Sequence, residues 1–132
     1  MADTTTYRFA DVDWHVPVSP GVDPELAAEA GRLGVRRKLL AQGDSGFYTQ
    51  IVQIPPHFDS PAHSHDRAEI FMVLDGTCTV NGEQLEPYDM TVIPAGVEYG
   101  FVSGADGLRF LVVRGGAASF AGSGGTGFPS AS

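Results

Sequence analysis

The pattern of apolar and polar positions changes near Val35, and most of the chain beyond it alternates between short apolar runs and turn residues. The runs are rich in β-branched and aromatic residues, which is typical of β-strands. Residues 69–74 are apolar at both odd and even positions, which indicates a strand buried on both faces. We predict strands at 36–42, 47–54, 69–74, 77–80, 83–85, 90–93, 98–103 and 108–113.

The segments between these runs carry strong turn signals. Asn81-Gly82 stands between two of the runs and predicts a tight hairpin. Gly43–Gly46 also predicts a turn, and Pro55-Pro56 stops the strand before it. Short strands joined by turns predict an all-β fold, a jelly-roll sandwich or barrel.

One short helix is predicted before the strands begin. Asp23 matches an N-cap, Pro24 matches the first helical position, and Glu25 makes the first turn acidic. The helical pattern runs through about Ala30, and we expect Gly31 to end it.

Length and composition indicate one domain with extensions at both ends. The chain has 132 residues, of which 42% are hydrophobic, so it is long enough for one core. We expect an N-terminal extension with the helix over 1–35 and a β-barrel over 36–114. Residues 115–132 are mostly Gly, Ala and Ser, which predicts a flexible tail.

Charge and cysteine content exclude several kinds of partner. The formal net charge of −8 repels phosphate backbones and anionic membranes, so we expect neither nucleic acid nor membrane as a partner. Cys78 is the single cysteine and cannot form an internal disulfide, which favours a reducing compartment. No signal peptide or membrane-spanning apolar stretch is visible, so we expect a soluble cytoplasmic protein.

Three potential metal ligands, His63, His65 and Glu69, fall within seven residues. Alternate side chains of an extended chain point the same way, so the two imidazoles share a face. The intervening residues are enough to turn the chain and bring the carboxylate back beside them. Two imidazoles and one carboxylate form the facial triad that suits a divalent metal with open positions. The alternative is a pair of surface histidines near a salt-bridging glutamate.

This stretch resembles the first motif of the cupin family, in which His-x-His precedes a Glu and then a Gly. The second cupin motif contains Pro-x-Gly followed by His. The matching positions are His63, His65, Glu69, Gly76, Pro94 and Gly96. The departures are His57 and Tyr88 where the motifs open with Gly, Tyr99 where the fourth ligand is normally His, and Ser103 for Asn. The motifs span 57–103, and the strand pattern extends the likeness to about 36–114.

The resemblance implies a double-stranded β-helix that binds a metal through His63, His65 and Glu69. The triad favours Fe(II), with Zn, Mn or Ni as alternatives. The family favours a dioxygenase-like enzyme acting on a small organic metabolite, with isomerase or lyase chemistry as the nearest alternative. A second alternative is a non-catalytic cupin that binds or senses a small ligand. We also expect a homodimer, because barrels of this size often pair and strands apolar on both sides need covering.

Two further residues are candidate catalytic groups. Tyr99 would face the metal if the Pro94–Gly96 turn acts as it does in cupins. It could be a phenolate ligand, an acid, base or hydrogen-bond donor, or a core aromatic, and we predict mainly a hydrogen-bond donor. His57 could be a base or substitute ligand at the pocket mouth, or an exposed loop residue. Four residues are candidate pocket walls or, in the alternative, simply core: Tyr48, Phe71, Val73 and Phe101.

Overall fold

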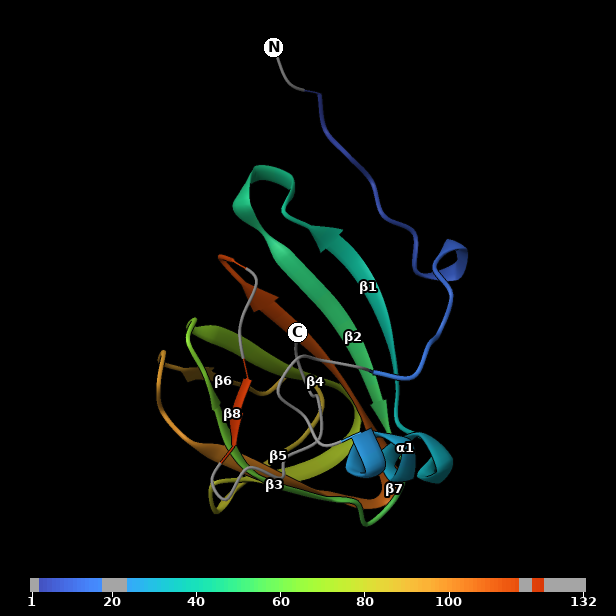
Figure 1. Ribbon diagram of the computed structural model, residues 1–132, viewed down its shortest axis with the longest axis vertical. Helices are drawn as coiled ribbons and strands as arrows, with labels where there is room; N and C mark the ends of the chain where they lie inside the picture. The colour runs from blue at the N-terminus through green and yellow to red at the C-terminus, as the bar shows by residue number, and fades with distance from the viewer. Residues whose placement is uncertain (1–2, 18–23, 117–119, 123–132) are drawn as a thin grey trace.

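The computed structural model describes residues 3–17, 24–116 and 120–122, and these form an antiparallel β-structure with one α-helix (Figure 1). The all-β prediction is therefore confirmed. The elements are η1 (Phe9–Asp11), α1 (Pro24–Leu33), β1 (Arg36–Gln42), η2 (Asp44–Gly46), β2 (Tyr48–Ile54), β3 (Asp59–His65), β4 (Glu69–Val80), β5 (Glu83–Leu85), β6 (Met90–Ile93), β7 (Tyr99–Arg114) and β8 (Phe120–Gly122). Among the described residues, no helix is long and apolar enough to cross a membrane.

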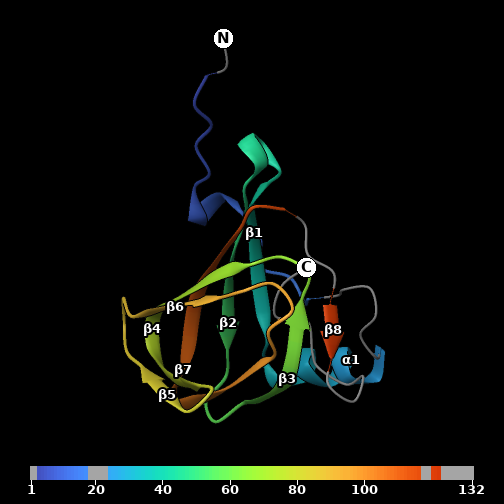
Figure 2. The same cartoon turned by 90° about the vertical axis from the view of Figure 1, so that its left-hand side faces the viewer.

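Two long strands, β4 and β7, organise the fold because they pair with each other almost from end to end. The C-terminal half of β7 also pairs with β2, and its N-terminal half pairs with β3. The opposite edge of β4 pairs first with β6 and then with β5. The two strands thus belong to both halves of a folded sheet, which is the arrangement of a jelly roll (Figure 2).

The bend in this strand pair lies at Gly76 and Gly107, both of which have positive φ. A Cβ atom on Gly76 would lie 2.1 Å from the carbonyl oxygen of Gly107, so the close approach excludes a side chain. The separate strands predicted at 69–74 and 77–80 are therefore one strand with a bulge. The runs at 98–103 and 108–113 are likewise joined in β7.

The predicted hairpin at Asn81-Gly82 is confirmed, with β4 before it and β5 after it. Both residues have positive φ, as a type I′ turn requires.

The helix begins at Pro24, as predicted, but it extends to Leu33, so the prediction that Gly31 ends it is wrong. Gly34 ends the helix with φ of +110°. The Val35 N–H donates to the Ala30 carbonyl and the Gly34 N–H to the Gly31 carbonyl, which is a Schellman motif. A Cβ on Gly31 would lie 2.8 Å from Val16, so that glycine serves close packing. The expected N-cap Asp23 lies outside the described residues.

Within the predicted tail of 115–132, residues 120–122 form β8 and pair with His63–His65 of β3 (Figure 2). The edge of β3 next to the histidines carries backbone groups that need partners, and β8 supplies them. The rest of the predicted tail, residues 117–119 and 123–132, lies outside the described part of the chain.

Candidate functional site

Five ionisable residues meet at one end of the barrel, and their positions follow from strand register. His63 on β3 lies opposite Tyr99, the first residue of β7. Glu69, the first residue of β4, lies opposite Arg114, the last residue of β7. The fifth residue, His65, follows two positions after His63 on the same face. Each of the five is at most 4% exposed, so the structure brings the predicted residues His63, His65, Glu69 and Tyr99 together in a buried cluster.

The two imidazoles are neighbours, with ring centroids 5.1 Å apart. His63 Nδ1 lies 2.9 Å from the Pro61 carbonyl oxygen, and a proton on Nδ1 makes this contact a hydrogen bond. In this tautomer Nε2 is the unprotonated nitrogen, as in many metal-binding histidines. Burial lowers the pKa of His63, so the ring is held neutral.

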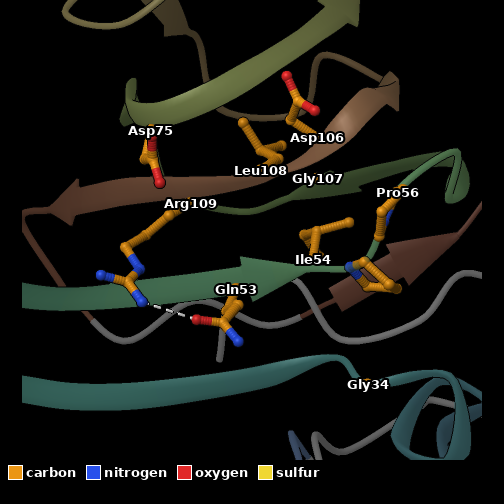
Figure 3. Close-up of a pocket in the computed structure, with 10 residues that line it drawn as sticks. Gly34, Gln53, Ile54, Pro56, Asp75, Asp106, Gly107, Leu108 and Arg109 are labelled. Atoms are coloured by element: carbon orange, nitrogen blue, oxygen red, sulfur yellow. Dashed lines mark hydrogen bonds between the residues drawn. The ribbon is translucent and has the colours of Figure 1, made fainter.

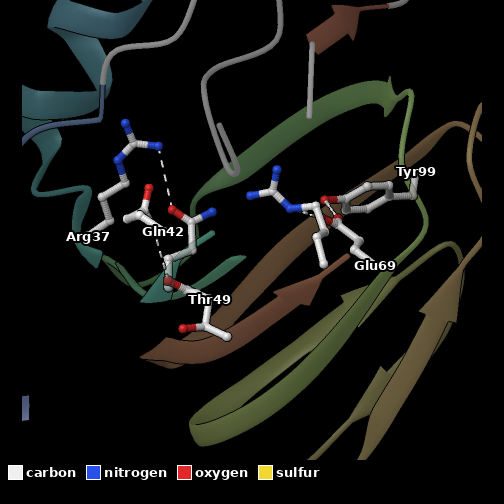
Figure 4. Close-up of polar contacts among 7 residues, drawn as sticks. Arg37, Gln42, Thr49, Glu69 and Tyr99 are labelled. Carbon is white, nitrogen blue, oxygen red and sulfur yellow. Dashed lines mark hydrogen bonds and ion pairs between the residues drawn. The ribbon is translucent and has the colours of Figure 1, made fainter. Parts of the chain in front are cut away.

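The Glu69 carboxylate has a different partner on each side (Figure 4). The Tyr99 hydroxyl donates a hydrogen bond to Oε1, and Arg114 Nε lies 3.4 Å from Oε2. Burial raises the pKa of Glu69, whereas the Tyr99 hydrogen bond and the Arg114 charge favour its ionised form. Tyr99 also packs against His63, with ring centroids 4.5 Å apart, so the phenol lies between the imidazoles and the carboxylate.

This arrangement bears directly on the predicted metal triad. Among the described residues, no group of three or more His, Cys, Asp or Glu side chains is placed to hold a metal ion. The donor chemistry nevertheless suits a divalent metal, because two imidazoles and a carboxylate belong to one cluster. Glu69 is engaged by Tyr99 and Arg114, whereas the two imidazoles lie next to each other.

Below the cluster lies an aromatic core that includes three of the four predicted pocket walls. Phe71, Val73 and Phe101 are at most 1% exposed, and the Phe71 ring stacks on Phe110 with centroids 4.1 Å apart. These residues form the packed floor of the cluster. The fourth, Tyr48, is half-buried at the start of β2, beside the turn at Gly43.

Two cavities lie near or beyond the cluster. A cavity of about 220 Å³ is bordered by Glu69 and Arg114 together with the apolar residues Phe47, Ala68, Ile70, Val92 and Val113. A larger one, about 380 Å³, includes Gln53, Asp75 and Arg109 and contains none of the five clustered residues (Figure 3). There Arg109 donates a 2.8 Å hydrogen bond to Gln53 (Figure 3). Its strand neighbours Leu108 and Phe110 are buried, so the Arg109 side chain lies on the opposite, outward face.

Comparisons with known proteins agree with this fold and these motif positions. The family described as "Cupin domain" matches residues 50–114, which include all five clustered residues. The chain belongs to the cupin family. No curated protein sequence matches it.

Solved cupin structures resemble the chain over most of its length. The polyketide cyclase RemF from Streptomyces resistomycificus is 23% identical, with a TM-score of 0.62 over 86% of this chain and 79% of RemF. KdgF from Halomonas sp. is 22% identical, with a TM-score of 0.63 over 85% of this chain and 94% of KdgF. An RmlC-like cupin from Shewanella frigidimarina is 17% identical, with a TM-score of 0.62 over 86% and 93%. At these identities the likeness shows the fold alone.

The structure explains two departures from the cupin motifs. His57 and Tyr88, which replace the glycines that open the motifs, both have positive φ, at 55° and 73°. The backbone therefore keeps the glycine conformation without the glycine. The structure places His57 in the exposed turn between β2 and β3, where it borders a cavity with Glu29, Leu33 and Phe58 and stands apart from the buried cluster.

Sequence reasoning missed Arg114 as a site residue. Phe110, Val112 and Arg114 share the inward face of β7, and the first two are fully buried. An arginine that continues an inward apolar alternation was the signal that could have identified it. Without the pairing of Glu69 with Arg114, however, nothing in the sequence shows which carboxylate it meets.

Proposed function

We propose that this cupin is a metal-dependent enzyme, dioxygenase-like, that acts on a small organic metabolite. The observation that carries the proposal is the joint burial of His63, His65, Glu69, Tyr99 and Arg114 at one end of the barrel, beside its apolar core. Burying ionisable groups opposes folding unless they are paired, so a purely structural core would not gather five of them. Perturbed titratable groups in one cluster are typical of functional sites.

His63 and His65 would hold the ion, with Glu69 as the carboxylate ligand. Fe(II) is favoured for two imidazoles and one carboxylate, and Zn, Mn or Ni are alternatives. The ion, when bound, would supply redox or Lewis-acid chemistry. The Pro61 carbonyl would orient His63 by accepting a hydrogen bond from its Nδ1–H.

The other residues have separate roles in this proposal. Tyr99 keeps its proton and donates a hydrogen bond from its hydroxyl to Glu69 Oε1, which keeps the carboxylate oriented. Arg114 balances the carboxylate charge inside the barrel. The stacked rings of Phe71 and Phe110 close the floor of the cluster and exclude water from it.

A second candidate function is binding or sensing of a ligand without turnover. The specific observation in its favour is the Glu69–Arg114 ion pair, which occupies the carboxylate that a metal would use. Isomerase or lyase chemistry remains an alternative within the enzyme proposal, since the similar structure RemF is described as a polyketide cyclase. The small-molecule substrate, the absence of nucleic-acid and membrane partners, and the cytoplasmic location stay predictions.

Metal analysis of protein purified without an affinity tag or added metal is the direct test. We expect close to one divalent ion per chain, lost in His63→Ala, His65→Ala and Glu69→Ala while the fold survives. His15→Ala is the matched control, because His15 is exposed and far along the chain from the cluster. If a variant that carries all three substitutions still binds one metal ion per chain, the metal site lies elsewhere.

Oxygen uptake with a panel of phenols, catechols and β-dicarbonyl compounds distinguishes the reaction types. We expect Fe(II)-loaded protein to consume oxygen with at least one compound. Product formed without oxygen would favour isomerase or lyase chemistry. Saturable binding without any product would favour the sensor.

A further inference from the structure

Arg114 has donors that the cluster does not use. Its Nε atom is 3.4 Å from Glu69 Oε2, and this contact is an ion pair without hydrogen-bond geometry. Nε and Nη1 are both buried and have no hydrogen-bond partner among the described residues. Buried donors are normally satisfied, so these two indicate an acceptor that lies outside the described chain.

A second buried guanidinium, that of Arg37, stands near Arg114. Arg37 lies on β1 opposite Val52, is 5% exposed, and its Nη1 donates to Gln50 Oε1 at 3.5 Å (Figure 4). Burial, together with the charge of Arg114, lowers the pKa of Arg37 to about 10. The charge of Arg114 therefore disfavours the protonated form of Arg37.

The charges around this pair do not balance. Glu69 is the one carboxylate among the buried residues that the structure describes, against the two buried guanidiniums. Tyr99 and the exposed Asp66 also act on Arg114, but Asp66 lies at the surface. A surplus cation in a low-dielectric interior favours an anionic ligand.

We propose that Arg114, with Arg37 beside it, binds a carboxylate group of the ligand, so that the site selects small organic acids. This inference rests on the proposed function in one respect, since it takes the His63–Glu69 cluster as the place where the ligand binds. A planar guanidinium fork matches a carboxylate through two parallel hydrogen bonds.

Calorimetric titration of the full-length protein tests this inference. Malonate and benzoate serve as probes, malonamide and benzamide as neutral controls of the same shape, and inorganic phosphate as a different anion. We expect at least one carboxylate to bind about 10- to 100-fold more tightly than its amide, because a hydrogen-bonded charge pair is lost in the amide. Arg114→Gln should lose that preference. Equal binding of amide and acid, or phosphate binding as tight as that of either acid, would overturn the proposal.

Matched variants separate the role of Arg114 from general effects. Arg109→Gln makes the same change on the same strand, at a side chain that faces outward, and should bind as the wild type does. Because Arg114→Gln leaves Glu69 buried without its cation, the double variant Glu69→Gln/Arg114→Gln and the charge-preserving Arg114→Lys are measured beside it. If Arg114→Gln and the double variant Glu69→Gln/Arg114→Gln both fold and keep the full preference for acids over amides, Arg114 does not bind the carboxylate.

The experiment also separates this inference from the metal proposal. The double variant His63→Ala/His65→Ala should lose metal yet keep the preference for acids over amides. If it loses that preference while Arg114→Gln keeps it, the carboxylate binds through the histidine site, and the inference is wrong. A wild-type protein without metal that still prefers acids through Arg114 would reject the metal proposal and support this one.

Discussion

At the scale of single residues, the Tyr99 hydroxyl is the group on which the site depends most. It is buried and donates to Glu69 Oε1, so it links the carboxylate to the imidazole pair through the packing of its ring on His63. The sequence left three roles open for Tyr99, and the structure shows a hydrogen-bond donor whose partner is Glu69.

We predict that Tyr99→Phe keeps metal but lowers turnover by about 10- to 1,000-fold, if the hydroxyl stabilises charge in the reaction. It should also cost about 1–3 kcal/mol of unfolding free energy, because one buried carboxylate oxygen loses its donor. Metal analysis, initial rates and urea unfolding measure the three quantities. Tyr88→Phe is the control, since Tyr88 is 76% exposed. Loss of metal in Tyr99→Phe would instead identify the phenol as a ligand.

Cys78 gives a pH prediction away from the site. The thiol is buried, and burial raises its pKa to about 12 from an ordinary value of 9.0. Above pH 9 the unfolded chain ionises this thiol and the folded chain does not, so the unfolding free energy falls by about 1.4 kcal/mol per pH unit. Urea unfolding at pH 8, 9 and 10 should show a steeper loss in the wild type than in Cys78→Ala. If the unfolding free energy falls with pH equally in the wild type and in Cys78→Ala, the Cys78 thiol ionises equally in the folded and the unfolded chain.

At the scale of elements, the positive-φ positions of turns and bulges determine how the strands meet. Gly76 is the clearest case, because β4 bends there against Gly107. Tyr88 is the opposite case, since a bulky residue occupies a left-handed conformation at the turn before β6 while its N–H donates to the Val73 carbonyl at 2.7 Å.

We predict that Gly76→Ala lowers the unfolding free energy by more than about 2 kcal/mol, since the new Cβ would overlap the Gly107 carbonyl and keep an unfavourable φ. Gly82→Ala is the control: its φ is also positive, at 85°, but no atom lies within 4 Å of the added Cβ. Denaturant unfolding of both variants measures the difference. Equal losses would mean that φ alone, and not the close approach of the strands, matters at Gly76.

We predict that Tyr88→Gly raises the unfolding free energy by roughly 0.5–1 kcal/mol. Removing the left-handed strain gains about 1–2 kcal/mol, and the greater freedom of glycine in the unfolded chain offsets part of this. Tyr88→Ala is the control, because it removes the same exposed ring and keeps the strain. If Tyr88→Ala raises the unfolding free energy as much as Tyr88→Gly does, the effect comes from removing the tyrosine ring and not from relieving the backbone strain.

At the scale of the whole molecule, the barrel leaves apolar side chains uncovered on one edge. β6 pairs with β4 alone among the described strands, and its Met90 and Val92 are 44% and 61% exposed. Val97, in the turn after β6, is 44% exposed. Apolar side chains on a strand edge favour association with another chain.

We predict a homodimer that uses this edge. Light scattering at micromolar concentration should give twice the monomer mass for the wild type, and Val92→Lys should shift the mass toward that of the monomer. Glu98→Lys, a charge change close in sequence but at an already polar exposed position, should leave the dimer intact. A monomeric wild type would show that the edge has no partner copy.

The sequence alone located most of the strands, because their cues are local, but β3 and β8 were not among the strands predicted. Alternation and β-branched content located β1, β5 and β6 at their observed bounds, and Asn81-Gly82 located a hairpin. The same cues could not show that two pairs of predicted strands are continuous. A glycine at a bulge within a strand and a glycine at a turn between strands give the same sequence pattern. The end of α1 was misplaced for a similar reason, because Gly31 serves a contact with Val16 that lies 15 residues earlier.

For the site, the sequence determined which residues gather, and the tertiary structure decided which of them touch. The His-x-His spacing and strand parity predicted that His63, His65 and Glu69 meet, and the resemblance to the second cupin motif added Tyr99; the structure buries all four together. Only the register of β4 against β7 sets Arg114 opposite Glu69, and only the turn geometry leaves His57 exposed. Ion pairs between residues 45 positions apart depend on how the whole sheet closes, and local sequence patterns carry no information about that closure.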